Sequence, residues 1–550
     1  MTKWIVFSFF GILVLVLVAC TAHTVREVTP PAESVSRVWV ADNGDGTYTN
    51  PVLHADYSDP DAIRVGDDFY MTASSFTCVP GLPVLHSRDL VNWKIIGHAL
   101  PCQIPRDVYN RPQQGNGAWA PCIRYHQGEY CIYYPDPDFG IYMVKARNPA
   151  GPWSEPLLVK SGKGIIDPSP LWDDDGKAYL VHAFAGSRAG IKSILVVCRM
   201  NDEGTKVLDD GVVVFDGHDT HPTLEGPKFY KRNGIYYIFA PGGGVKYGWQ
   251  VVLRSKNIYG PYEDRVVMAQ GGSVINGPHQ GAWVELKNGE NWFIHFQDKG
   301  PYGRVVHLQP MKWENDWPVI GMDEDRDGTG EPVLRYKKPG TGTTWPTATP
   351  CESDEFNGTT LGLQWQWNAN PSPGWAIPFP GESLLRLYSV PLPEPFRNFY
   401  LDVPNTLLQK FPAPAFTATA KVTFRPRYEG EMAGLIIMGR DYAYLGIKDS
   451  ANRIRIAQTL CMKADEGAKE EETKEVHFTD SSCIYLRVSV TDSALCKFSY
   501  SVDNLRYQDA GTLFKAREGG WIGAKVGLFM ARKGKTNDAG SIDVDWFRIE

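Results

Sequence analysis

Five short segments decide the fold: Gly66-Asp67-Asp68-Phe69-Tyr70, Gly128-Glu129-Tyr130, Gly176-Lys177-Ala178-Tyr179, Asn233-Gly234-Ile235-Tyr236-Tyr237 and Asn288-Gly289-Glu290-Asn291-Trp292. In each, a polar turn leads into an aromatic, alternating β-strand, which is the pattern of a hairpin. Their last residues follow one another at intervals of 60, 49, 58 and 55 residues. Repeats of roughly 40–50 residues with several strands each indicate the blades of a β-propeller. The pattern therefore predicts five blades, with insertions that lengthen some intervals.

The second half of the chain alternates differently. Stretches such as Phe416 to Phe424 and Ile484 to Val490 alternate as strands, without a helical period. Many strands with regular turns predict a β-sandwich. We therefore predict an all-β chain with a five-bladed propeller at 46–338, a Pro/Gly/Thr-rich linker at 339–350 and a sandwich at 351–550.

The N-terminus has the features of an export signal. Lys3 precedes an apolar stretch of about 15 residues, shorter than the ~20 that a membrane-spanning helix needs. Leu17-Val18-Ala19-Cys20 resembles a bacterial lipobox, so residues 1–20 are predicted as a lipoprotein signal peptide with Cys20 as the lipidated residue. An ordinary signal peptide or a single anchor helix is the alternative. Polar residues 21–45 are predicted as a tether.

Export would place the protein on the periplasmic or cell-surface face of a bacterial membrane, which it would contact only through its lipid anchor. The formal net charge of −7 argues against a nucleic-acid partner, which needs a basic face. Aromatic residues make up 12% of the chain, a load common in all-β proteins and in proteins that stack on sugars. The cysteines show no metal-binding spacing and no Gly-rich loop has the context of a phosphate site.

One position recurs 11 to 13 residues before the end of each of the five segments. It holds Asp59, Trp119, Asp167, Glu225 and His279 in turn. Because the first strand of each propeller blade lines the central channel, these side chains should meet around one axis. A single Asp-Pro turn would carry little meaning, and the acids could instead cap turns or hold a structural ion. Their common register favours an active site, because hydrolysis of a glycosidic bond needs carboxyl groups with separated pKa values.

Several strings in the chain point to one family: Ser58-Asp59-Pro60-Asp61, Trp119-Ala120-Pro121, Ile166-Asp167-Pro168-Ser169 and Glu225-Gly226-Pro227. They resemble the corresponding strings of family 43 glycoside hydrolases. In the second half, Leu363 to Asn368 and Asn405 to Gln409 resemble the concanavalin-like sandwich appended to the β-xylosidase and α-L-arabinofuranosidase branch. The resemblance covers nearly the whole chain after the predicted signal.

The resemblance implies a role for each of the three acids. Asp59 would be the general base, Asp167 the residue that modulates pKa and orients, and Glu225 the general acid. The family inverts configuration, which requires room for a water molecule and carboxyl groups roughly 6.5–9.5 Å apart. No cofactor is required for this chemistry.

The resemblance also implies substrate-binding roles for Phe76, Trp119, Arg304 and His279. Phe76 and Trp119 would form hydrophobic walls for the terminal sugar, and Arg304 would contact sugar hydroxyls; core aromatics and a surface arginine are the alternatives. His279 matches the family's channel histidine beneath the site, and a satisfied core histidine is its alternative.

Acidic residues lie at both ends of the predicted sandwich sequence. Glu355 and Asp545 belong to these acidic pairs. Similar pairs bind a structural calcium ion in related sandwiches through oxygen ligands, so we expect calcium near these two residues as an alternative to solvated acids.

The β-xylosidase-like branch is exo-acting, because its sandwich lends a loop that closes one end of the pocket. The resemblance therefore implies release of a terminal pentose, β-D-xylose or α-L-arabinofuranose, from oligosaccharides of plant hemicellulose. Ala55-Asp56-Tyr57-Ser58 departs from the commonest xylosidase string, so the choice between the sugars stays open. The alternatives are a non-catalytic glycan-binding surface lipoprotein and an endo-arabinanase with an open cleft.

Overall fold

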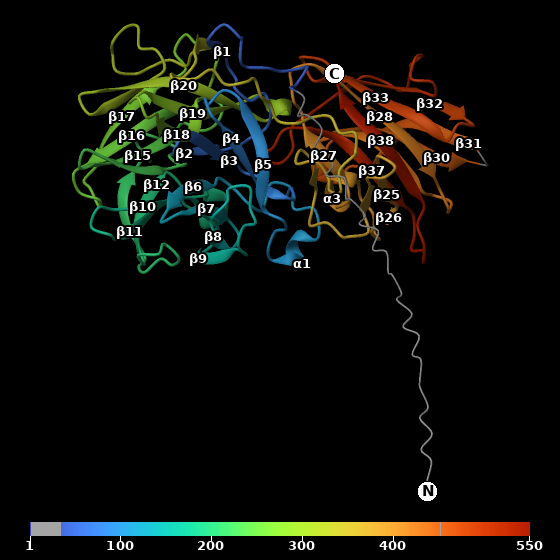
Figure 1. The fold of residues 1–550 in the computed structure, drawn as a ribbon, viewed down its shortest axis with the longest axis horizontal. Coiled ribbons are helices and arrows are strands. Elements are labelled where there is room, and N and C mark those ends of the chain that lie inside the picture. The colour runs from blue at the N-terminus through green and yellow to red at the C-terminus, as the bar shows by residue number, and fades with distance from the viewer. Residues whose placement is uncertain (2–34, 451–452) are drawn as a thin grey trace. The chain divides into compact units, whose positions relative to one another are not determined.

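The computed structural model describes residue 1, residues 35–450 and residues 453–550 (Figure 1). The predicted signal peptide, the lipidation site at Cys20 and the tether up to residue 34 lie outside the described residues. All residues after 34 belong to one compact unit.

The repeats fold into five four-stranded antiparallel sheets in the described part of the chain, each with its strands in sequence order. They are the blades of a propeller, coloured blue to yellow in Figure 1. The strands of the first two blades are β2 (Asp61–Val65), β3 (Asp68–Thr72), β4 (Gly81–Ser87) and β5 (Trp93–Leu100), then β6 (Cys122–His126), β7 (Glu129–Asp136), β8 (Gly140–Ala146) and β9 (Leu157–Ser161).

The remaining three blades follow the same order. Their strands are β10 (Ile165–Trp172), β11 (Ala178–Phe184), β12 (Ile194–Met200) and β13 (Val212–Asp216); β14 (Lys228–Arg232), β15 (Ile235–Gly242), β16 (Trp249–Ser255) and β17 (Glu263–Met268); and β18 (His279–Glu285), β19 (Asn291–Asp298), β20 (Arg304–Glu314) and β21 (Trp317–Ile320).

The predicted five-bladed architecture is confirmed, because each marker at the end of a repeat segment lies in the second strand of its blade. Neighbouring blades are held together by shared apolar cores. Phe69 and Met71 of the first blade, for example, pack in one cluster with Trp292 and Ile294 of the fifth. The ring is thus closed by burial of apolar side chains between its first and last blades.

Backbone hydrogen bonds support this closure. Strand β1 (Thr47–Thr49) pairs with β22 (Arg335–Lys337), which follows the fifth blade. Leu53, just before the first blade, exchanges hydrogen bonds with Val306 in β20.

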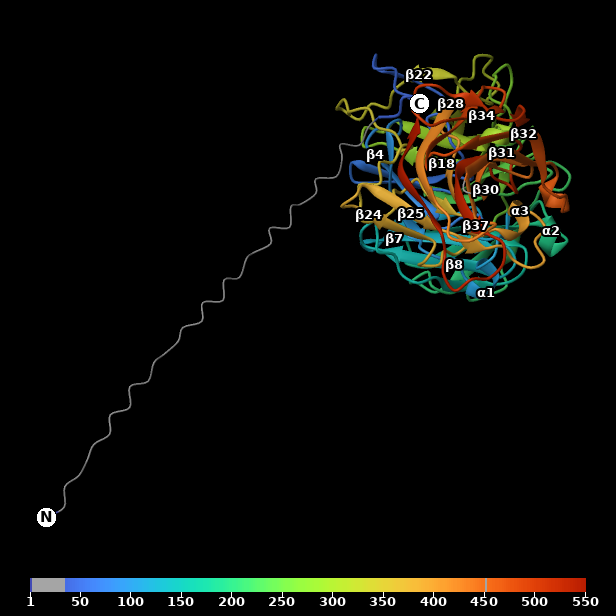
Figure 2. The same ribbon diagram turned by 90° about the vertical axis from the view of Figure 1, so that its right-hand side faces the viewer.

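Residues 351–550 form the predicted β-sandwich (Figure 2). One sheet has the order β23 (Gln366–Trp367), β27 (Leu407–Lys410), β37 (Lys525–Arg532), β29 (Met432–Met438), β30 (Tyr442–Ser450), β31 (Arg453–Cys461) and β32 (Glu471–Thr479), with β26 (Val390–Pro391) on β37. The other has β24 (Ala376–Phe379), β25 (Leu384–Tyr388), β38 (Ser541–Ile549), β28 (Phe416–Arg425), β33 (Cys483–Val490), β34 (Leu495–Ser501) and β35 (Gln508–Asp509), with β36 (Phe514–Lys515) on β34.

Alternation in the sequence explains the sandwich core. Strand β33 buries every second side chain, and these pack in one cluster with residues of the facing sheet such as Leu435 and Leu528. Helices are short: α1 (Arg106–Tyr109), α2 (Gly186–Ala189), α3 (Phe399–Asp402) and the 3₁₀ turns Gly300–Tyr302 and Ala464–Glu466.

Residues 35–45, which were predicted to be the last part of the tether, pack against the folded domains instead. Ser36 donates through Oγ to Glu352 at 2.9 Å, and Asp42 forms a 2.6 Å ion pair with Lys338. Ala41 is buried. This segment therefore belongs to the folded unit, because its side chains find partners that the polar composition alone does not reveal.

Candidate active site

The innermost strands of the blades bring the residues of the recurring position to one place. Asp59, Trp119 and Glu225 lie two or three residues before β2, β6 and β14, and Asp167 lies within β10. These four residues line one cavity of about 410 Å³, together with Phe76, Arg304, Ile166, Lys192, Gln280 and Trp521 among others. The structure thus brings the three carboxylates together in one cavity, as their common position in the repeats predicted.

Asp59 is held by three donors. Oδ1 accepts from Nη1 of Arg304 at 2.9 Å, and Oδ2 accepts from the hydroxyls of Ser58 at 2.8 Å and Ser74 at 2.6 Å. The side chain is buried, and the backbone has a φ of 54°. A non-glycine residue in the left-handed region costs energy, of the order of 1 kcal/mol, and such residues cluster at functional sites. Asp59 is therefore a fixed carboxylate that faces the cavity.

Asp167 repeats this backbone conformation in the third blade, with a φ of 55°. Its Oδ2 accepts a 2.7 Å hydrogen bond from the amide of Gly226. Gly226 has a φ of 58°, and a Cβ atom there would lie 2.8 Å from the side chain of Gln280, so glycine is favoured directly after Glu225. Burial and the nearby Glu225 carboxylate raise the pKa of Asp167. A buried carboxyl group beside a second carboxyl group keeps its proton to higher pH than an isolated acid does.

Glu225 differs from the other two acids in its exposure. Its side chain is 26% exposed, whereas Asp59 and Asp167 are almost completely buried. Nε2 of His279 lies 3.1 Å from Oε1 of Glu225. The buried imidazole of His279 therefore orients the carboxyl group of Glu225, which lines the cavity.

His279 does not take the predicted substrate-binding position. It opens β18, is 1% exposed and is not among the residues that line the cavity. The position of His279 in the sequence repeat predicted only that it lies on an inner strand. The packing around the ring decides that the imidazole points toward Glu225. The structure makes His279 a residue that holds the carboxyl group of Glu225.

Aromatic side chains form the walls of the cavity. The rings of Phe76 and Trp119 meet edge to face at 6.3 Å, and Trp119 meets Trp521 at 6.1 Å. Nε1 of Trp119 donates to the carbonyl of Gly115 at 2.7 Å, which fixes the indole. Arg304 lies under this wall, with its guanidinium 5.8 Å from the Trp521 ring. The predicted positions of Phe76, Trp119 and Arg304 at the site agree with this arrangement.

Trp521 was missed by the sequence analysis. It comes from the sandwich, and its indole is 51% exposed at the cavity. Its loop is anchored on the propeller, where the amide of Ala524 donates to the carbonyl of Pro301 at 2.8 Å. A tryptophan in a glycine-rich turn, Gly519-Gly520-Trp521-Ile522-Gly523, was the available signal. The sandwich thus supplies part of the wall of a propeller pocket.

Glu355 and Asp545, near which a calcium ion was expected, each have a basic partner in the structure. Glu355 forms a two-pronged ion pair with Arg548, and Asp545 pairs with Lys421 at 2.8 Å. Within the described ranges, the one group of three potential ligands is Asp323, Asp325 and Asp327, in a loop after β21. Basic partners from neighbouring strands therefore neutralise the acids that the sequence alone left unpaired.

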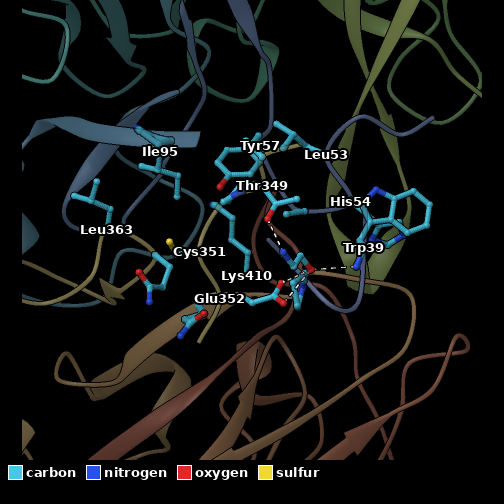
Figure 3. A pocket seen from close by; sticks show the side chains of 18 of the residues that line it. Trp39, Leu53, His54, Tyr57, Ile95, Thr349, Cys351, Glu352, Leu363 and Lys410 are labelled. Carbon is cyan, nitrogen blue, oxygen red and sulfur yellow. Dashed lines mark hydrogen bonds between the residues drawn. The ribbon is translucent and has the colours of Figure 1, made fainter. Parts of the chain in front are cut away.

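A second cavity, of about 60 Å³, lies where the segment before the first blade meets the propeller and the sandwich (Figure 3). Its walls are mostly apolar, and Glu352 is the single carboxylate among its described lining residues. Ser36 already donates to that carboxylate. Without a second acid, this cavity is not equipped for acid–base hydrolysis.

Across the residues that the structure covers, no helix is both long and apolar enough to span a membrane.

Comparisons with known proteins agree with this geometry. The family model "Glycosyl hydrolases family 43" matches residues 48–318, and "Beta xylosidase C-terminal Concanavalin A-like domain" matches residues 353–550. A protein of Xylanibacter ruminicola named "Putative beta-xylosidase" is 40% identical over 91% of this chain and 90% of its own length. The "Non-reducing end alpha-L-arabinofuranosidase BoGH43B" of Bacteroides ovatus is 32% identical over 91% of this chain and 94% of its own.

Solved structures give the same result. "Bacteroides ovatus Xyloglucan PUL GH43B" superposes with a TM-score of 0.77 at 28% identity, over 92% of this chain and 99% of that one. With both halves matched and the three carboxylates gathered in one pocket, the chain belongs to glycoside hydrolase family 43, as an enzyme built from a five-bladed propeller and a concanavalin-like sandwich.

Proposed function

We propose that the protein is an exo-acting, inverting glycosidase that releases a terminal β-D-xylose or α-L-arabinofuranose from hemicellulose oligosaccharides. The observation that carries this proposal is the cavity of about 410 Å³, in which Asp59, Asp167 and Glu225 face aromatic walls from both domains. Relatives named as β-xylosidase and as non-reducing end α-L-arabinofuranosidase support both sugars.

In the proposed mechanism, Asp59 is the general base. A carboxylate held by Arg304 and two hydroxyls would take a proton from a water molecule as that water attacks the anomeric carbon. Glu225 is the general acid and would protonate the leaving oxygen. Its partial exposure supports this role, because the acid must reach an oxygen that departs toward solvent.

Asp167 supports the acid in this proposal. Its carboxyl group is buried next to Glu225, and burial together with the Glu225 charge raises the pKa of Asp167. The hydrogen bond from Gly226 ties Asp167 to the backbone directly after Glu225. Asp167 is thus placed to position Glu225 and to influence it through the charge that the two carboxyl groups share across the pocket.

Two other functions are less well supported. A purely glycan-binding protein would have no use for a base, an acid and a buried third carboxyl group in one pocket. An endo-acting arabinanase needs an open cleft, whereas Trp521 of the sandwich narrows this pocket. Incubation with arabinan and xylan oligosaccharides separates these readings: monosaccharide alone supports exo action, oligosaccharides of mixed length support endo action, and no product supports binding alone.

The test of the proposed function compares 4-nitrophenyl β-D-xylopyranoside with 4-nitrophenyl α-L-arabinofuranoside on the purified protein. Turnover of either glycoside, with a product of inverted anomeric configuration by NMR, supports the proposal. Retention of configuration, or turnover of neither glycoside by a folded protein, overturns it.

We also propose that the protein is exported and anchored through a lipid on Cys20. The lipobox-like string Leu17-Val18-Ala19-Cys20 supports this proposal. Membrane fractionation of the wild type and of Cys20→Ala tests it. The variant should leave the membrane fraction while its specific activity stays unchanged; an unchanged distribution would contradict the anchor.

A further inference from the structure

A buried carboxylate outside the recurring position joins the two domains at the active site. Asp56 lies three residues before Asp59 and is 3% exposed. Its Oδ1 accepts a 2.9 Å hydrogen bond from the amide of Arg304, and its Oδ2 accepts a 2.9 Å hydrogen bond from the amide of Gly523. One carboxylate therefore binds backbone from a propeller strand and backbone from a sandwich loop.

Each of these two backbone segments carries a residue of the pocket. Arg304 is the donor to Oδ1 of Asp59, and Trp521, two residues before Gly523, forms part of the aromatic wall. The joint is also tightly packed: a side chain at Gly303 would lie 2.4 Å from the Asp56 carboxyl carbon, and one at Gly523 would lie 2.7 Å from the Gly303 amide. The two positions that pack against Asp56, Gly303 and Gly523, therefore have no space for a side chain.

We infer that Asp56 is a positioning residue that couples the Trp521 wall of the pocket to the arginine that holds the base. The inference rests on the proposed role of Asp59 as base. Asp56 itself does not line the pocket, so it acts through Arg304 and through the loop of Trp521. Two charge-assisted hydrogen bonds from backbone amides give a short, directional joint that apolar contact alone would not provide.

The substitution Asp56→Asn tests this role with almost no change of volume. An amide offers one acceptor oxygen, and its nitrogen is a donor, so either the Arg304 amide or the Gly523 amide loses its partner and faces a donor. We expect kcat/KM on an aryl pentoside to fall about tenfold or more, with a higher KM from the displaced Trp521 and a lower kcat from the displaced Arg304.

The pH profile separates positioning from a general loss of structure. The charged groups around Asp59 are Arg304, which pairs with it, and Asp167, which senses its charge. If Asp56→Asn loosens the ion pair between Arg304 and Asp59, the acidic limb of kcat/KM should move to higher pH, because loss of a cationic partner disfavours a carboxylate. The wild type is assayed in parallel. If the wild type does not hydrolyse the aryl pentoside, the proposed function has failed and there is no pH profile with which to test Asp56.

Tyr302→Phe is the matched control. The Tyr302 hydroxyl, in the turn just before Gly303, lies within hydrogen-bond distance of the carbonyls of Pro414 and Thr491 in the sandwich, at 2.8 and 2.7 Å. No hydrogen bond joins it to Asp56 or Asp59 among the described residues. This variant should lower the melting temperature without moving the acidic limb. If Tyr302→Phe moves the limb as Asp56→Asn does, the coupling role of Asp56 is refuted.

A double-mutant cycle measures the coupling directly. Because Asp56 holds the loop of Trp521, the effects of Asp56→Asn and Trp521→Ala on KM should be clearly less than additive. Should Asp56→Asn not fold, Gly523→Ala forces the same joint apart from the sandwich side and should raise KM and move the acidic limb. Additive effects, or a folded Asp56→Asn with wild-type kcat/KM and pH profile, would overturn the inference.

Discussion

Nε2 of His279 lies 3.1 Å from Oε1 of Glu225, so the proposed acid is held from behind by a ring that is 1% exposed. The proposed base is held differently, by the Arg304 guanidinium and two hydroxyls. The two carboxyl groups thus have different surroundings in one pocket, as acid and base catalysis require.

Glu225→Gln and Asp59→Asn should each lower kcat by about 10²–10⁴-fold on xylobiose or 4-nitrophenyl pentosides, because each removes a proton-transfer group. A substrate with a 2,4-dinitrophenolate leaving group distinguishes the two roles. That leaving group needs no proton, so Glu225→Gln should recover most of its activity and Asp59→Asn should not. Melting curves check that both variants fold; the reverse pattern of recovery would exchange the two assignments.

Asp167→Asn should move the alkaline limb of the kcat profile to lower pH. Burial and the Glu225 charge raise the pKa of Asp167, and because repulsion between two carboxylates acts on both partners, removal of one of them should move the limb that reports the general acid. A profile measured from pH 4 to 10 on one pentoside tests this shift, and an unmoved alkaline limb would show that Asp167 does not act on the general acid through its charge.

The stability of Asp167→Asn provides a second measurement. Asp167 has a higher pKa in the folded state than in the unfolded chain, so the folded state binds more protons above the unfolded value of 3.8. Stability is therefore lost as pH rises from that value through the folded pKa. The variant should melt at a higher temperature than the wild type at pH 9 and show a smaller difference at pH 4. Equal differences at both pH values would contradict this linkage.

Trp521→Ala should raise KM about tenfold with a smaller effect on kcat, because the indole forms a wall of the pocket and donates no hydrogen bond to the carboxylates. Trp546→Ala is the matched control, because Trp546 does not line the pocket. Its ring lies on the sandwich, with the guanidinium carbon of Arg548 4.2 Å from the ring centre. Kinetics on the preferred pentoside compare the two; equal effects would mean that Trp521 acts only through stability.

Lys410→Met should stabilise the protein at pH 6.5. Burial at the domain junction, with a contribution from Lys525, lowers the pKa of Lys410 to about 8. The unfolded chain therefore binds more protons than the folded state between about pH 8 and the ordinary lysine pKa of 10.5. The destabilisation by this group is complete below about pH 8 and is lost as pH rises from there to 10.5. The gain at pH 6.5 should be on the order of 1–3 kcal/mol, visible in denaturant curves. The gain should decrease as pH rises above about 8 and vanish above the ordinary lysine pKa of 10.5; a gain that does not change with pH would assign it to packing.

Local patterns in the sequence predicted the blades, the sandwich and the register of Asp59, Asp167 and Glu225. They succeeded because hairpin turns and strand alternation are short-range features. A propeller also converts equal offsets in the sequence into equal positions around one axis. The same rule placed His279 on an inner strand but said nothing of the direction of its ring.

Tertiary structure alone decided the remaining parts of the site. Asp56 and Gly523 are 467 residues apart and belong to domains that share no repeat, so no periodicity could pair them. For the same reason Trp521 and the basic partners of Glu355 and Asp545 escaped the sequence analysis. A repeat specifies positions within one symmetric domain, whereas a contact between two domains depends on how their surfaces pack.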